Sequence, residues 1–227
     1  MKKSIYVFLF LSALSTVLFS FKHAAKITEG VVVFDIAFLD LTPEMKQAEA
    51  MLPKTLTMYF KGQNMRGEMP TAMGTTTTIS NEKKKEFYVL MDMMGQKTAI
   101  KQTETDLKKQ QQEQDVKDIK VTYSAETKTI AGYLCKKAVI TFTMKSEKET
   151  VECFYTDELP IVGNKNSTPG FDQIKGFMME YSINMSGVKM KMTARSVRAE
   201  KVDDSKFTLP EGYTVKTMEE LKKMSGE

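Results

Sequence analysis

Apolar and polar residues alternate along most of this chain, in the period-two pattern that is typical of half-buried β-strands. Such alternation occurs over residues 32–38, 56–60, 87–91, 119–123, 138–144 and 151–155. Successive side chains of a strand point to opposite faces, so each segment presents one apolar and one polar face. Short turns separate most segments, which favours an antiparallel sheet of about ten strands with one buried face.

The clearest hairpin comes near the end of the chain. Its first strand places Phe177, Met179, Tyr181, Ile183 and Met185 on one face, and its second strand returns Val188, Met190, Met192 and Ala194 to the same face. Ser186-Gly187 lies between the strands, and glycine allows the positive φ that tight hairpin turns require. The sequence therefore predicts two adjacent strands with a methionine-rich face.

Helices are few in this pattern. Thr42-Pro43 opens one helix, whose inner face we expect to carry Met45, Ala48 and Leu52. A second begins at the C-terminal end, because Thr217 and Glu220 have the spacing of a capping box. A short helical turn is expected over residues 169–175. Residues 103–118 are polar and glutamine-rich, so they are read as a solvated helix or a mobile insert.

Residues 1–25 predict a secretory leader. Lys2 and Lys3 supply a positive start, an apolar run follows to Phe19, and small residues occur at Ala24 and Ala25. The run of about 15 residues is short for ~30 Å of hydrocarbon, which favours a leader over an uncleaved membrane anchor. No cysteine lies near its end for lipid attachment. We expect an exported protein of the periplasm or cell envelope, with residues 26–227 as one domain.

The histidine count and the charge exclude several function classes. The only histidine, His23, lies within or at the edge of the predicted leader. Catalytic triads, Cys–His pairs and histidine metal sites therefore lack their imidazole. The formal charge of +4 falls to +1 without the three lysines of residues 1–25, so no basic surface indicates nucleic-acid binding. The run Lys83-Lys84-Lys85 is read as a solvated turn.

Enzyme motifs are missing. The sequence has no G-x-S-x-G elbow, no phosphate-binding glycine loop and no C-x-x-C pair. Neighbouring acids, such as Asp203-Asp204 and Glu219-Glu220, are read as exposed surface, with catalysis by acidic, serine or tyrosine side chains alone as the alternative. We expect no enzymatic activity and no cofactor.

Cys135 and Cys153 are the only cysteines. Two cysteines in an exported protein favour a disulfide. A hairpin turn near Ser146, however, places Cys135 opposite about residue 157 of the next strand, not opposite Cys153. Two buried free thiols are the alternative.

Methionine is the compositional outlier, with 18 among 227 residues. One interpretation is core filling, because most methionines fall on apolar strand faces. A second is a soft cavity for an apolar ligand, since thioether side chains are flexible and polarizable. A third is Cu(I) binding by Met91, Met93 and Met94, because thioethers are soft ligands.

Five segments, taken in order, resemble the domain-of-unknown-function 4412 family of exported bacterial proteins. They are ITEG (27–30), FKGQNMR (60–66), IAGYLCKK (130–137), FYTDELP (154–160) and FTLPEGY (207–213). The architecture of that family is similar to periplasmic lipoprotein carriers and outer-membrane lipoprotein-sorting proteins. The resemblance covers about residues 27–215. Phe154 departs from it, because a tryptophan is expected before Tyr155.

The resemblance implies a curved antiparallel half-barrel of mainly β structure, an α+β fold with two or three short helices on its concave side. The cleft of such a fold holds acyl chains, and Arg66 is the only match to an arginine that controls cargo. We expect the cleft to be lined by Phe34, Met58, Phe60, Met91, Phe142, Met179, Tyr181, Met190 and Met192. The function expected is binding of an apolar or lipid-like ligand or a lipidated partner. A structural module that meets an envelope protein is the alternative.

Overall fold

The computed structural model describes residues 27–225 apart from residues 114, 163–167 and 186–187. The predicted leader and the Ser186-Gly187 turn therefore lie outside the described residues. Within the described part, twelve strands form one sheet in the order β12-β6-β5-β4-β3-β2-β1-β11-β10-β9-β8-β7. Every ladder is antiparallel except that between β12 and β6. The mainly antiparallel fold is confirmed.

The strands are β1 (Glu29–Leu39), β2 (Thr55–Lys61), β3 (Asn64–Thr71), β4 (Gly74–Asn81), β5 (Glu86–Met93), β6 (Gln96–Gln102), β7 (Lys117–Ile130), β8 (Tyr133–Met144), β9 (Glu147–Thr156), β10 (Phe177–Met185), β11 (Val188–Arg198) and β12 (Thr214–Thr217). The helices are α1 (Pro43–Gln47), α2 (Glu104–Glu113) and α3 (Met218–Ser225), with 3-10 turns η1 (Glu49–Met51), η2 (Phe171–Gln173) and η3 (Asp204–Phe207).

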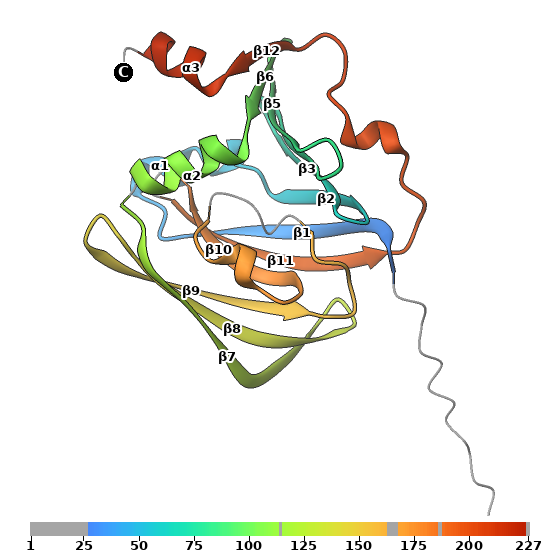
Figure 1. Cartoon of the computed structure of the whole chain (residues 1–227), viewed down its shortest axis with the longest axis vertical. Coiled ribbons are helices and arrows are strands. Elements are labelled where there is room, and N and C mark those ends of the chain that lie inside the picture. Colours follow the sequence, from blue (N-terminus) through green and yellow to red (C-terminus); the bar gives the residue numbers. More distant parts are fainter. Residues whose placement is uncertain (1–26, 114, 163–167, 186–187, 226–227) are drawn as a thin grey trace, which may run out of the picture.

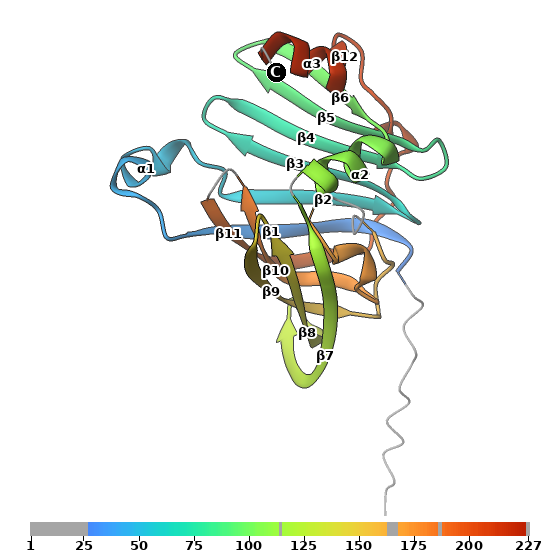
Figure 2. The ribbon, with the colours of Figure 1, turned by 60° about the vertical axis from the view of Figure 1, so that its left-hand side comes forward.

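The sheet is open and curled, with α2 on its concave side and the segment between β11 and β12 on its outer side (Figure 1). Three short helices accompany the sheet, and α2 is the one that lies on the concave side among the described residues. Figure 2 shows α1 projecting beyond the ends of β1 and β2. Helix α3 instead packs at the edge of the sheet, against β6 and β12.

Helix α1 begins as the sequence predicts but does not pack as expected. The Thr42 side chain accepts a hydrogen bond from the Met45 backbone N–H (3.3 Å), and Pro43 occupies the first turn. No residue of α1 or η1 is buried, so the inner face expected for this helix does not exist. The capping box of α3 is confirmed, because Thr217 and Glu220 each accept a hydrogen bond from the other's backbone N–H.

One large hydrophobic core fills the concave side of the sheet near β1 and β8–β11. Cross-strand neighbours place Ile36 and Tyr181 on either side of Met192. The rings of Phe34 and Tyr181 lie 6.0 Å apart, and that of Phe171 lies 5.5 Å from Tyr181. Phe171 belongs to the connection between β9 and β10, so the chain's own crossover segment fills this part of the concave side.

The crossover supplies four buried apolar side chains, Leu159, Val162, Phe171 and Ile174. Gly170 lets it approach the sheet closely. This residue has a φ of 81°, and an added Cβ would lie 2.6 Å from the Ile140 side chain. Only glycine adopts this conformation without strain and leaves room for β8.

A second, smaller cluster lies on the outer face of β4–β6. Its buried members are Ile79, Tyr88, Leu90 and Ala99, and Leu209 and Tyr213 of the C-terminal segment pack against them. The Asn81 side-chain amide also donates a hydrogen bond to the Phe207 carbonyl oxygen (3.1 Å). The C-terminal segment therefore seals the outer face of these strands.

Candidate functional site

The structure places all but one of the predicted cleft residues in the packed core. Each of these side chains is less than a tenth exposed: Phe34, Met58, Phe60, Phe142, Met179, Tyr181, Met190 and Met192. They contact one another and the crossover segment in a single cluster. In the structure these side chains are therefore packed core residues, with apolar residues of the crossover among them.

Met91, the remaining predicted cleft residue, lies on a different part of the concave side. It is half-buried on β5, together with Val89 and Met93 on the same strand and Ile100 on β6. We call these four residues the β5–β6 strip. Ile100 lies directly opposite Val89 in the ladder between the two strands. None of the four packs in either hydrophobic cluster.

The register shows which face of the sheet the strip occupies. Tyr88 and Leu90 alternate with Val89 and Met91 along β5, and both pack in the cluster on the outer face. Since successive side chains of a strand point to opposite faces, Val89 and Met91 face the concave side. The C-terminal segment covers the outer face of these strands, whereas the concave face presents the half-buried side chains of the strip.

The strip continues across neighbouring strands. Thr98, Met91, Thr76 and Met69 follow one another from β6 to β3 in the ladder registers. Three strand spacings of ~4.8 Å make this row ~14 Å long. Met69 packs against the large core, so the row leads from the strip to the border of the packed core. Figure 2 shows α2 standing in front of this side of the sheet.

The methionines of the Cu(I) alternative do not share one environment. Met91 and Met93 are half-buried on one face of β5. Met94 lies in the turn to β6, with a φ of 51° and 86% of its surface exposed. Among the described residues, no three His, Cys, Asp or Glu side chains gather where they could hold a metal ion.

Cys135 and Cys153 are buried free thiols, as the alternative interpretation stated. Cys153 lies opposite Ala138, which is three positions after Cys135 on β8. Positions three apart on a strand point to opposite faces, so the sheet separates the two thiols. Burial raises the pKa of Cys135 to about 11 and that of Cys153 to about 12. Both thiols therefore stay protonated and unreactive at neutral pH.

Thiol titration checks this arrangement. We expect no measurable reaction of the native protein with an aromatic disulfide reagent at pH 8, because both sulfurs are buried and protonated. In denaturant without reductant, both thiols should react. Absence of reactive thiols in denaturant would demonstrate a disulfide and contradict the register.

Arg66 lies on the outer face of the sheet, away from the concave side. Its neighbour across the ladder is Ile79, a member of the outer cluster. The guanidinium Nε donates to Glu68 (2.6 Å), and Nη1 donates to the Lys206 carbonyl oxygen (3.3 Å). The cargo-controlling role implied by the resemblance does not fit this position. Arg66 instead stabilises the C-terminal segment through its hydrogen bond to Lys206.

An Arg66→Met variant tests that assignment. We expect a loss of about 1–3 kcal/mol in the free energy of unfolding, because the hydrogen bonds to Glu68 and Lys206 disappear. Limited proteolysis should then cut the C-terminal segment faster. If Arg66 controlled a ligand, affinity for a lipophilic probe would change while stability stayed constant.

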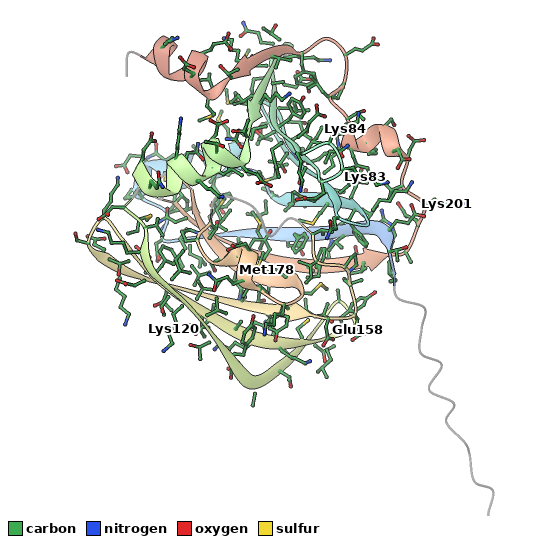
Figure 3. The ribbon with its side chains drawn as sticks, in the orientation of Figure 1. Lys83, Lys84, Lys120, Glu158, Met178 and Lys201 are labelled. Atoms are coloured by element: carbon green, nitrogen blue, oxygen red, sulfur yellow. The ribbon has the colours of Figure 1, made fainter. Side chains whose placement is uncertain are left out.

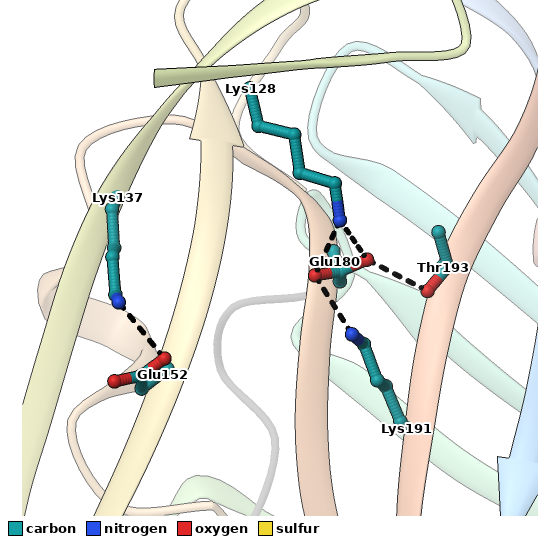
Figure 4. Close-up of polar contacts among 6 residues, drawn as sticks. All are labelled: Lys128, Lys137, Glu152, Glu180, Lys191 and Thr193. Carbon is teal, nitrogen blue, oxygen red and sulfur yellow. Dashed lines mark hydrogen bonds and ion pairs between the residues drawn. The ribbon is translucent and has the colours of Figure 1, made fainter. Parts of the chain in front are cut away.

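The outer side of the sheet carries a charged cluster around Glu180 (Figure 4). The Glu180 carboxylate is buried and accepts hydrogen bonds from Lys128 (2.9 and 3.1 Å) and Thr193 (3.1 Å), with an ion pair to Lys191 (3.1 Å). Burial alone raises the pKa of Glu180, but these three partners outweigh it and hold the pKa below its usual value. The alternation put Glu180 on the polar face but gave no sign of its burial.

The lysine run of residues 83–85 lies in the turn between β4 and β5, where all three side chains are exposed. Figure 3 shows Lys83 and Lys84 at the surface, away from the concave side. The expected solvated turn is confirmed. A polar cavity of about 460 Å³ lies beside this turn and includes Lys61, Asn64 and Lys85 in its lining.

Comparison with known proteins gives a family and similarities to solved structures. The model of a domain of unknown function, DUF4412, matches residues 42–161, more than half of the chain. Among solved structures, the chain is similar to LprF from Mycobacterium bovis, with a TM-score of 0.34 and 13% sequence identity, covering 84% of this chain and 92% of that one. No curated protein matches. The family expected from the order of the five segments is confirmed.

Proposed function

The chain belongs to the DUF4412 family, a domain family of unknown function, and we propose that it is a non-enzymatic binding protein. Its ligand is an acyl chain, from a lipid or a lipidated partner, held on the concave face of β3–β6. The observation that carries the proposal is the β5–β6 strip, whose four apolar side chains are half-buried and belong to neither hydrophobic cluster.

The chemistry of the strip suits an acyl chain. Burial of apolar surface contributes about 0.8 kcal/mol for each methylene group removed from water. Two of the four side chains are methionines, which are unbranched and adapt to different apolar shapes. Thr76 and Thr98 lie on either side of Met91 in the ladder and add methyl groups beside small hydroxyl groups.

Binding is favoured over catalysis by the state of the nucleophiles. Both cysteine thiols are buried and have raised pKa values, so neither provides a thiolate. Tyr181 is also buried, and its pKa is raised because water cannot reach the phenol.

Export to the periplasm or envelope, proposed from the leader in residues 1–25, would place the protein near membrane lipids. Within the described part of the chain, no helix is long and apolar enough to cross a membrane.

The structural-module alternative would use an edge of the sheet, and of the two edge strands, the four-residue β12 and the longer β7, only β7 offers a long edge. That edge is badly suited to strand pairing. Its ladder with β8 is irregular at two places, between Lys117 and Lys120 and between Tyr123 and Thr127. Natural sheets use such bulges, together with edge lysines, to prevent pairing with other chains. The geometry therefore favours ligand binding over edge docking.

Fluorescence titration with the neutral probe N-phenyl-1-naphthylamine tests the proposal on a chain of residues 26–227. We expect saturable binding that palmitate displaces. A Met91→Glu variant should weaken binding tenfold or more, because the charge would have to be buried under the ligand.

Met73→Glu is the matched control, since Met73 lies in the turn between β3 and β4 and is 52% exposed. This variant should change the affinity less than twofold. Absence of saturable binding, or an equal loss in both variants, would refute the proposed function.

A further inference from the structure

A groove of about 280 Å³ opens on the outer side of the sheet, over β9, β10 and β11. It is separate from the concave face that carries the β5–β6 strip. Its lining includes apolar groups from Leu39 and Phe154, hydroxyls from Thr150 and Ser182, ammonium groups from Lys189 and Lys191, and carboxylates from Glu152 and Glu180. Ligand sites for drug-sized molecules start at about 300 Å³, so this groove suits only a small molecule.

The groove lining carries two ammonium groups and two carboxylates, and the ion-pair partners Lys128, Lys137 and Glu126 leave one ammonium group in excess. Glu180 in the lining is shared by Lys128 and Lys191, so two positive charges face one negative charge. Lys189 is exposed and makes no ion pair among the described residues. On the other wall, Lys137 pairs with both Glu126 and Glu152, as Figure 4 shows for Glu152.

Glu180 also fixes the position of the ammonium groups. The Lys191 Nζ has three N–H donors and lies 3.1 Å from a single carboxylate oxygen. The Lys128 Nζ is held from a second side, 5.4 Å from the centre of the Phe154 ring. A lysine held in this way loses less conformational entropy when it binds a further anion than a free surface lysine does.

We propose that this groove binds a small carboxylate with a short aliphatic body. The carboxylate accepts hydrogen bonds from Lys189 and Lys191, with the hydroxyls of Ser182 and Thr150 at its side. The aliphatic body lies against Leu39 and the Phe154 ring. Hydrogen bonds between charged groups are the stronger ones in proteins.

Titration with hexanoate, followed by NMR on the same chain of residues 26–227, tests the proposal. We expect backbone amide shifts at Leu39, Ser182 and Lys189, with saturation. Lys189→Met should weaken hexanoate binding at least fivefold. Lys189 is exposed and unpaired, so this variant should fold normally. Lys191→Met should weaken binding further, with thermal unfolding confirming that the variant is folded.

Three controls test whether hexanoate binds specifically in this groove. Lys84→Met changes an exposed turn lysine and should leave hexanoate affinity unchanged. Met91→Glu should weaken probe binding on the concave face tenfold or more and leave hexanoate shifts in the groove intact. Hexanol, which has the same body without the charge, should not shift the groove amides. Hexanoate shifts that are absent, confined to the concave face, or equal in Lys189→Met and the native chain would overturn the proposal.

Discussion

A Lys128→Met/Lys191→Met double variant should lose about 3–5 kcal/mol of unfolding free energy, because it leaves an uncompensated buried carboxylate. The Glu180 side chain is only 8% exposed, whereas those of Lys128 and Lys191 are 45% and 39% exposed. The lysines can turn to water when their partner is lost, but the glutamate cannot. Glu180→Gln should therefore cost less, about 1–3 kcal/mol.

The pH dependence of stability should also reverse in the double variant. In the native chain the pKa of Glu180 is held below its value in the unfolded chain. Ionised Glu180 therefore adds to the free energy of unfolding above about pH 4.3, and this stabilisation is lost as the pH falls. Without the lysines, burial raises the folded pKa above the unfolded one. Stability should then rise as the pH falls from 7 towards about 4.3, because the folded state binds the extra proton.

Urea unfolding at several pH values measures both effects. The control is Lys97→Met, which breaks the exposed pair with Asp92 at 3.8 Å. It should cost at most about 1 kcal/mol, as exposed ion pairs do. A double variant that costs no more than this control, or whose stability keeps the native pH trend, would contradict the burial of Glu180.

Phe34→Ala should lose about 3–5 kcal/mol, the range for deleting a large aromatic side chain from a packed core. Phe34 is fully buried, and its ring lies 6.4 Å from that of Phe177 and 6.0 Å from that of Tyr181. Both the lost ring contacts and the cavity left beside Phe177 and Tyr181 lower the free energy of unfolding. For a chain of this size, the midpoint of thermal unfolding should fall by about 6–20 °C.

Phe38→Ala provides the comparison for Phe34→Ala. Phe38 lies on the same face of β1, opposite Met190, but is only half-buried near the end of the strand. The Phe38→Ala variant should lose clearly less unfolding free energy than Phe34→Ala, because fewer side-chain contacts disappear. Equal costs for the two variants in thermal unfolding would show that the concave side near Phe34 is not packed shut.

Local patterns in the sequence were sufficient to predict most of the strands and the helix caps. The hairpin of β8 and β9 has its turn where Ser146 predicted it, and Lys136 lies opposite Tyr155. The capping box at Thr217 is present as well. These features depend on residues close together in sequence, where alternation and side-chain hydrogen bonding determine the structure.

Strands without apolar alternation were missed. β4 carries four consecutive threonines, which suit a strand but give no hydrophobic period. β12 has only four residues and pairs with a strand more than a hundred positions earlier. The structure therefore has twelve described strands where about ten were expected.

The candidate site depended on long-range packing and was predicted only in part. Residues such as Phe34 and Met190 have the right apolar character for a cleft, but the crossover segment covers them. That segment's apolar residues lack a strand or helix period, so its place inside the sheet could not be predicted. Glu180 was missed because its burial depends on Lys128, which lies 52 residues earlier.

The central claim is that an acyl chain binds the half-exposed methionines of the concave face and not the packed core. Methyl NMR of the protein with ¹³C-labelled methionine, titrated with palmitate, tests it most directly. We expect the methyl signals of Met69, Met91 and Met93 to shift and saturate together, while those of the buried Met58, Met190 and Met192 stay in place. No shift of Met91 and Met93, or shifts centred on the core methionines, would contradict the account.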